Sequence, residues 1–231
     1  VEGPSDRLAM QALLDPLLSR LTSAGTQVDF IPAGNKKKLV LQVPVRGINI
    51  LLNDPTAVVI ALPDLYTQNT GFPHKTFNEL AERLHAAFSR ALERKGITDA
   101  RLRKRFGVYC FKHDLEALLL AAEEQMAARL GVPILQRRWR VPVEDQDHNV
   151  PPKKVVESLF NKYRQRYRDT VDAPLILKAA HYRDVAAACP EGFGPPGNLP
   201  GVPAGARSSS CSVPSWTLNS SQVANPARVG A

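Results

Sequence analysis

The chain has 231 residues, of which 44% are hydrophobic and 23% are charged, and its 30 basic residues outnumber the 22 acidic ones to give a net charge of +8. This composition is typical of a globular protein and permits a polyanionic partner. The sequence has no apolar run near the ~20 residues of a membrane span, no secretory signal, and no cysteine spacing typical of a metal site or disulfide framework. We therefore expect a cytoplasmic protein that is not an integral membrane protein.

The first 53 residues combine one clear helical pattern with two less regular segments. Leucines at helical spacing follow a candidate N-cap at Ser5 and end at Gly25, which predicts a helix. Residues 28–31 have the composition of a short strand. Residues 36–53 stay open, because their β-branched side chains favour a strand while a proline and a glycine interrupt any regular element.

The middle of the chain alternates strand and helix patterns. Residues 56–62, TAVVIAL, are almost wholly apolar and predict a central strand that is covered on both faces. An amphipathic stripe predicts a helix at about 75–95. Residues 107–111, GVYCF, predict a second strand, which leads into a helix that runs to about Leu130. Further helices are expected at about 153–168 and 173–188.

Strands separated by helices predict an α/β fold, here a three-layer arrangement with a mainly parallel central sheet flanked by helices. We expect this domain to span residues 1–193, with a helical C-terminal part at about 151–190. Residues 194–231 consist mainly of small residues and proline without an apolar period. Such a segment buries too little apolar surface to offset its ordering entropy, so we predict a disordered C-terminal tail.

Acidic side chains stand where the predicted strands end. Glu2 and Asp6 flank the start of the first helix, and Asp64 follows the first apolar strand. Asp114 and Glu116 begin the helix after the second strand. Ligands of open α/β sheets bind outside the carboxyl ends of the strands, and carboxylates that converge there suit Mg²⁺. The alternative for each acid is a favourable position at the N-terminus of a helix, or simple solvation.

The remaining motifs narrow the choice of chemistry. His113 lies just before an apolar helix, where a histidine serves either as a cap or packing residue or as a metal ligand or general base. The four other histidines have no spacing typical of a zinc site. The sequence also lacks a nucleophile elbow, a phosphate-binding glycine loop and a dinucleotide fingerprint, which removes the commonest hydrolase, ATPase and dehydrogenase classes.

Basic residues gather in four clusters, at 36–38, 101–105, 137–140 and 162–168. The last two interleave arginine with aromatic residues, a combination that suits contacts to the phosphates and bases of nucleic acids. The alternative for each cluster is a solvated surface. The candidate nucleic-acid contacts are Lys37, Arg103, Arg105, Arg138, Arg140 and Arg164.

Four motifs, in chain order, resemble those of one family. Residues 1–6, VEGPSD, resemble the opening of Toprim-like domains. DLY at 64–66 and HDLEALL at 113–119 are similar to segments of a Toprim-like family, domain of unknown function 4276 (DUF4276). The end of the domain, with PKK at 152–154 and a later Cys-Pro at 189–190, is similar as well. The resemblance covers about residues 1–193.

The resemblance implies the Toprim fold, a small parallel sheet flanked by helices that occurs in topoisomerases, primases and nucleases. It also implies that Glu2 is a general acid/base and that Asp64 is a ligand of Mg²⁺ or Mn²⁺. Glu116 and His113 would complete the site. The family resemblance further implies a separately encoded ATPase partner of the ABC or structural-maintenance type, often in phage defence.

One position departs from the family pattern, because Tyr66 stands where the usual D-x-D motif has its second aspartate. A complete metal site therefore needs Asp114 or Glu116 instead. Our leading hypothesis is Mg²⁺- or Mn²⁺-dependent processing of phosphodiester bonds in DNA or RNA. The alternatives are a non-catalytic subunit that binds nucleic acid or an ATPase, and phosphoryl transfer on a small nucleotide.

Overall fold

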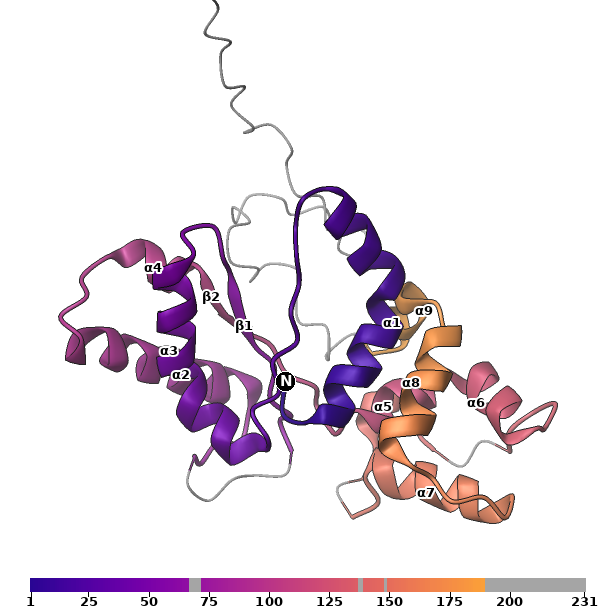
Figure 1. Ribbon diagram of the computed structural model, residues 1–231. Helices are drawn as coiled ribbons and strands as arrows, with labels where there is room; N and C mark the ends of the chain where they lie inside the picture. Colours follow the sequence, from indigo (N-terminus) through magenta and orange to yellow (C-terminus); the bar gives the residue numbers. More distant parts are fainter. Residues whose placement is uncertain (67–71, 137–138, 148, 190–231) are drawn as a thin grey trace, which may run out of the picture.

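The computed structural model describes residues 1–66, 72–136, 139–147 and 149–189. Within them the chain has an α/β arrangement of helices around a small parallel sheet, as Figure 1 shows. The predicted tail at 194–231 lies outside these residues. No helix in the described part of the chain is long and apolar enough to cross a membrane.

The sheet described by the structure has two parallel strands, β1 (Val59–Ala61) and β2 (Phe106–Val108). Helices connect them, as a parallel pair requires. Beyond the strands an isolated parallel bridge joins Asp64 to Phe111, so the two chain segments stay side by side past the end of the ladder. The sequence therefore located both strands, although both are shorter than predicted.

The expectation that the first strand is covered on both faces is wrong. The side chain of Ala61 is buried, but Ile60 is 45% exposed and Val58 is 50% exposed. Successive side chains of a strand point to opposite faces, so the face that carries Ile60 is open within the described residues. An unbroken apolar run is thus no proof of burial on two sides.

Residues 36–53, which the sequence left open, form helix α2 (Lys36–Asn53). Its buried side chains recur at helical spacing, and Asn35 caps it by accepting a hydrogen bond from the Lys38 amide at 2.9 Å. Gly47 lies against the sheet, where the Cβ atom of any larger residue would stand 3.4 Å from the Val59 side chain. The glycine thus brings the helix close to β1 instead of breaking it.

Two further helices complete the sheet half of the molecule, α3 (Phe77–Arg94) and α4 (Ala100–Lys104). The amphipathic stripe predicted at 75–95 is confirmed, because Leu80, Leu84, Phe88 and Leu92 are all buried in the core that α2, α3 and the sheet share. The ring of Phe88 stacks on Phe106 of β2, with ring centroids 4.2 Å apart.

The other half of the molecule is helical and has a core of its own. Figure 1 shows α1 and the later helices on one side of the amino terminus, and the sheet with α2, α3 and α4 on the other. Besides a short 3-10 turn at Val143–Asp145, this half contains α1 (Pro4–Ser23), α5 (Glu116–Ala121), α6 (Glu123–Leu130), α7 (Pro152–Lys162), α8 (Asp169–Ala179) and α9 (Tyr182–Ala188).

Four expectations about the elements need correction. Residues 28–31 form no strand, and the N-cap of α1 is Gly3 rather than Ser5. The helix expected at 153–168 ends at Lys162, because Arg164 adopts a left-handed backbone with φ of 57°. The helix expected at 173–188 begins earlier, at Asp169, and is divided into α8 and α9.

Candidate functional site

The carboxyl ends of β1 and β2 lie at the junction of the two halves, beside the amino terminus (Figure 1). Asp64 follows β1, and Asp114 follows β2 just before α5. The backbone of residues 1–3 reaches the same place, where the Val1 carbonyl accepts a hydrogen bond from the Ala33 amide at 3.1 Å. The fold thus brings together chain segments that are far apart in sequence.

Glu2 and Asp64 are in direct contact at this junction. The Glu2 Oε1 atom accepts a hydrogen bond from the Asp64 backbone amide at 2.9 Å, across 62 positions of sequence. Asp6 has a different role, because its Oδ2 atom accepts the Gly3 amide at 2.7 Å and so caps α1. The interpretation of Asp6 as a helix-terminal acid therefore describes its contact best.

Asp64 is the acid most affected by its surroundings. Burial raises its pKa well above the usual range, and the nearby charges of Glu2, Asp6 and Asp114 raise it further. Lys36, which is buried in the first turn of α2, acts in the opposite direction. The Lys36 Nζ atom also donates to the Leu65 carbonyl at 2.9 Å. The junction therefore holds several carboxylates around one buried lysine.

Asp114 lies on the side of this group that faces the helical half. Its Oδ2 atom accepts the Lys153 amide at 3.3 Å, at the start of α7, whereas its Oδ1 atom is buried without a hydrogen-bond partner among the described residues. Burial, followed by the charge of Glu116, raises the pKa of Asp114 to about 7. A buried carboxylate oxygen without a donor is costly unless a ligand or cation satisfies it.

Glu116 is turned away from Glu2 and Asp64, into the helical half. It is 4% exposed, accepts a hydrogen bond from the Tyr167 hydroxyl at 3.1 Å and lies 3.9 Å from the Lys153 Nζ atom. Burial raises the pKa of Glu116, while the Lys153 charge lowers it. Lys153 also pairs with Asp169 at 3.4 Å. These contacts give Glu116 partners of its own.

The sequence-predicted metal ligands Asp6, Asp64, Asp114 and Glu116 thus form a row of acids rather than one cluster. Among the residues that the structure describes, no group of three or more histidine, cysteine, aspartate or glutamate side chains is arranged to hold a metal ion. Mg²⁺ is commonly held by one or two carboxylates, with water and substrate phosphates as the other ligands. Asp64 and the free oxygen of Asp114 fit that smaller donor set.

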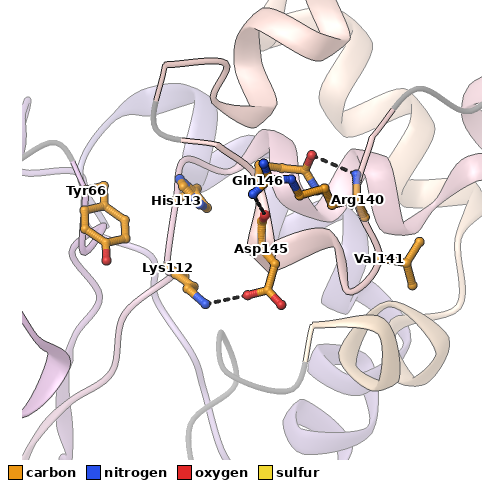
Figure 2. A pocket seen from close by; sticks show the side chains of 7 residues that line it. All are labelled: Tyr66, Lys112, His113, Arg140, Val141, Asp145 and Gln146. Carbon is orange, nitrogen blue, oxygen red and sulfur yellow. Dashed lines mark hydrogen bonds and ion pairs between the residues drawn. The ribbon is translucent and has the colours of Figure 1, made fainter.

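A cavity of about 630 Å³ opens beside the strand ends and is shown in Figure 2. One wall comes from the segments that follow β1 and β2, with Tyr66, Lys112 and His113. The rings of Tyr66 and His113 contact each other, with centroids 5.3 Å apart. His113 is buried and also lines the cavity, so its role as a metal ligand or general base stays a prediction.

The opposite wall is a loop at residues 140–146. The Gln146 side chain accepts the Arg140 amide at 3.1 Å and donates to the Arg140 carbonyl at 2.9 Å, which closes the loop on itself. An ion pair of 2.7 Å between Lys112 and Asp145 links the two walls, as Figure 2 shows. Sequence reasoning missed Lys112, Asp145 and Gln146, and the one signal near them is the acidic run EDQD at 144–147.

The basic residues singled out from the sequence have diverse surroundings. Arg140 lines the cavity, and Lys37 and Arg164 are exposed. Arg103 donates to the Ser89 hydroxyl at 3.3 Å. Arg138 lies outside the described residues.

Arg105 has a structural role instead. Its guanidinium donates to four backbone carbonyls, which belong to Leu51, Asp54, Pro55 and Ala57. These contacts join the end of α2 to the start of β1. The guanidinium is therefore occupied inside the fold, and a contact with nucleic acid would compete with those bonds.

Comparison with known proteins identifies a family. A family model described as "Domain of unknown function (DUF4276)" matches residues 1–193. No curated protein and no solved structure matches the chain. The family inferred from the VEG, DLY and HDLEALL motifs is thereby confirmed, whereas its Toprim-like character stays a prediction.

Proposed function

This chain belongs to the DUF4276 family, and from the geometry of its junction we propose that it is a metal-dependent enzyme acting on phosphodiester bonds of nucleic acid. One observation carries the proposal: Glu2 contacts Asp64 at the carboxyl edge of a parallel sheet, the charge of Asp114 acts on Asp64 there, and a cavity lined by Lys112 and Arg140 lies beside them. Phosphoryl transfer is commonly catalysed by a metal ion that carboxylates hold and by basic side chains that bind the phosphate.

Each group has a role in this proposal. Asp64 and Asp114 would hold Mg²⁺ or Mn²⁺, which supplies charge stabilisation for phosphoryl transfer when it is bound. Glu2 accepts or donates the proton of the reaction, from a position fixed by its hydrogen bond to the Asp64 amide. Lys112 and Arg140 bind the phosphate backbone in the cavity, and His113 orients the bound group. Glu116 stabilises the helical half rather than binding the metal.

Two finer statements belong to the same proposal. We propose that the two strands are part of a three-layer Toprim arrangement, which the resemblance of the VEG and DLY motifs supports. We also propose that a separately encoded ATPase of the ABC or structural-maintenance type acts with the chain in phage defence.

The test is cleavage of supercoiled plasmid and of single-stranded RNA in Mg²⁺ and in Mn²⁺, with EDTA as the blank. We expect activity in the wild type and a loss of at least about a hundredfold in Asp64→Asn and in Asp114→Asn, because each removes a charge that the metal needs. Asp15→Asn is the matched control, since Asp15 is an exposed carboxylate on α1. Activity that survives Asp64→Asn would contradict the assignment.

A second function has an observation in its favour. The lack of a three-ligand group among the described side chains fits a non-catalytic subunit that binds nucleic acid or the ATPase. Calorimetric titration with Mn²⁺ separates the two functions. Binding that Asp64→Asn and Asp114→Asn abolish, and Asp15→Asn leaves unchanged, supports the enzyme; a wild type that binds no Mn²⁺ supports the subunit.

A further inference from the structure

The turn between α7 and α8 carries a pattern that the candidate site does not use. Over residues 164–168 exposure alternates strictly, with Arg164, Arg166 and Arg168 exposed and the two residues between them partly buried. From Gln165 onward, alternation with period two is the behaviour of an extended segment with one face on the protein and one in solvent, while Arg164 lies in the turn that ends α7. The backbone angles of Arg168, φ −129° and ψ 105°, are extended.

The inward residues fasten this segment to the helical core. The Gln165 side chain donates to the Leu130 carbonyl at the end of α6, at 3.3 Å. The ring of Tyr167 packs against Phe160 of α7, with centroids 5.2 Å apart, and its hydroxyl donates to the buried Glu116. Because the inner face is held at both residues, the arginines beside them point outward from a fixed backbone.

The three outward guanidinium groups make no hydrogen bond or ion pair within the described part of the chain. The arginine backbones do bond, since the Arg168 amide donates to Asp172 at 2.7 Å. Elsewhere in this half the buried charges are paired, as Arg129 is with Asp172. Three neighbouring cations whose side chains contact no acid in the described residues are therefore a local excess of positive charge.

Arg164 stands at a position that suits glycine better than arginine. Its φ of 57° lies in the left-handed region just after α7 ends, where a glycine has no steric penalty. The left-handed conformation costs an arginine about 1 kcal/mol more than a glycine. The turn therefore does not explain the arginine at this position, whereas a function of its positive charge does.

A hollow of about 410 Å³ lies against the row, and its lining contains three basic residues and two acidic ones: Lys153, Glu157, Arg166, Tyr167, Arg168, Asp169 and Thr170. Lys153 connects this hollow with the candidate site, because its amide donates to Asp114 and its ammonium group lies 3.4 Å from Asp169. A single residue therefore contacts both the arginine row's hollow and the acids at the strand ends.

We propose that Arg164, Arg166 and Arg168 form a track that binds the phosphate backbone of single-stranded nucleic acid and leads it to the junction. The inference rests on the proposed function only in taking nucleic acid as the ligand. Arg164 stands at the turn that ends α7, and Arg166 and Arg168 follow at alternate positions of the segment that leads into α8. Alternate residues of an extended segment lie about 6 to 7 Å apart, so the last two charges are spaced along the segment like successive phosphate contacts. Tyr167 is turned inward, so the contact is with phosphates and not through base stacking.

The test measures binding in EDTA, with no cleavage required. A fluorescent oligothymidylate is titrated with the full-length protein at several salt concentrations, and log K is plotted against log salt. The track variant is Arg164→Gly, Arg166→Gln and Arg168→Gln. The control is Arg83→Gln, Arg90→Gln and Arg94→Gln, three exposed arginines of α3, so that both variants lose three charges.

We expect the track variant to bind at least about tenfold more weakly, with a slope shallower by about 2, because each phosphate contact with a single strand contributes about 0.7 to the slope. The α3 variant should keep most of the wild-type affinity and slope. Equal slopes in the wild type and the track variant would overturn the track, as would a wild type that binds anionic vesicles but not the oligonucleotide.

A single substitution guards against misfolding. Arg164→Gly removes one guanidinium while it relaxes a left-handed backbone, so we expect an unchanged or higher midpoint of thermal unfolding together with weaker binding. A wild-type protein that binds the oligonucleotide but cleaves neither plasmid nor RNA would refute the proposed function alone. A wild-type protein that cleaves nucleic acid, and whose oligonucleotide affinity the three arginine substitutions leave unchanged, would refute the track alone.

Discussion

The two halves of the molecule hold their charges in different ways. In the sheet half, buried or half-buried cations bind backbone carbonyls: Arg105 joins α2 to β1, and Lys36 reaches Leu65. In the helical half, charged side chains bind one another, as Arg129 and Asp172 do. The carbonyls that Arg105 and Lys36 bind lie at the end of α2 and in the segments before and after β1, outside helix interiors and the strand ladder. The comparison teaches that a buried cation binds carbonyls where helix ends and loops leave them without a regular backbone partner.

The largest expected effect is in the helical half. Asp172 is 1% exposed and pairs with Arg129 through two guanidinium nitrogens. Arg129→Ala leaves that charge buried, so we expect the free energy of unfolding to fall by about 3 kcal/mol, measured by urea denaturation. The double variant with Asp172→Asn should recover part of the loss. A fall below about 1 kcal/mol would show that the pair is not what stabilises this half.

The next effect is in the sheet half. Arg105→Ala removes the hydrogen bonds to four backbone carbonyls, so we expect the free energy of unfolding to fall. The fall should be limited to about 2 kcal/mol, because some of these carbonyls then bond to water. The neighbouring Arg103→Ala is the control and should change stability by less than about 0.5 kcal/mol, since its one contact is exposed. Equal effects of the two substitutions would remove the contrast between the halves.

The smallest effect is at the junction and depends on pH. The pKa of Asp114 is raised to about 7 in the folded protein, so the native state holds a proton that the unfolded chain releases near pH 4. The contribution of Asp114 to the free energy of unfolding is therefore fully present below about pH 4 and declines as the pH rises to 7, by about 1 to 2 kcal/mol after allowance for partial solvent exposure. In EDTA, Asp114→Asn should flatten this decline; a wild-type profile without the decline would contradict the raised pKa.

The sequence predicted the strands and α3 because their patterns are local. TAVVIAL and GVYCF carry β-branched and aromatic residues in short runs, and α3 carries an unbroken apolar stripe. Residues 36–53 resisted prediction because Gly47 serves a tertiary purpose, the approach of α2 to β1, that composition does not express. The open face of Ile60 was missed for the same reason, since burial depends on what packs above a strand.

The candidate site was predictable in its location but not in its partners. The rule that ligands bind at the carboxyl ends of strands singled out Asp64 and Asp114, and the structure brings Glu2 to Asp64. The rule did not reveal that Glu116 bonds to Tyr167. Which of Asp114 and Glu116 faces Asp64 depends on the orientation of the first turn of α5, and the sequence does not express that orientation. The wall at 140–146 has no periodic pattern, so local reasoning had nothing to detect there.

Gln146 fixes the shape of that wall, which affects how fast a ligand can associate with the cavity. Its side chain imitates a strand partner for residue 140, taking the amide and giving to the carbonyl, so the loop has its shape before any ligand arrives. A surface formed in advance loses little conformational entropy when it is occupied. Encounter with a ligand then needs no loop closure, and the association rate should be set by diffusion and charge rather than by a folding step.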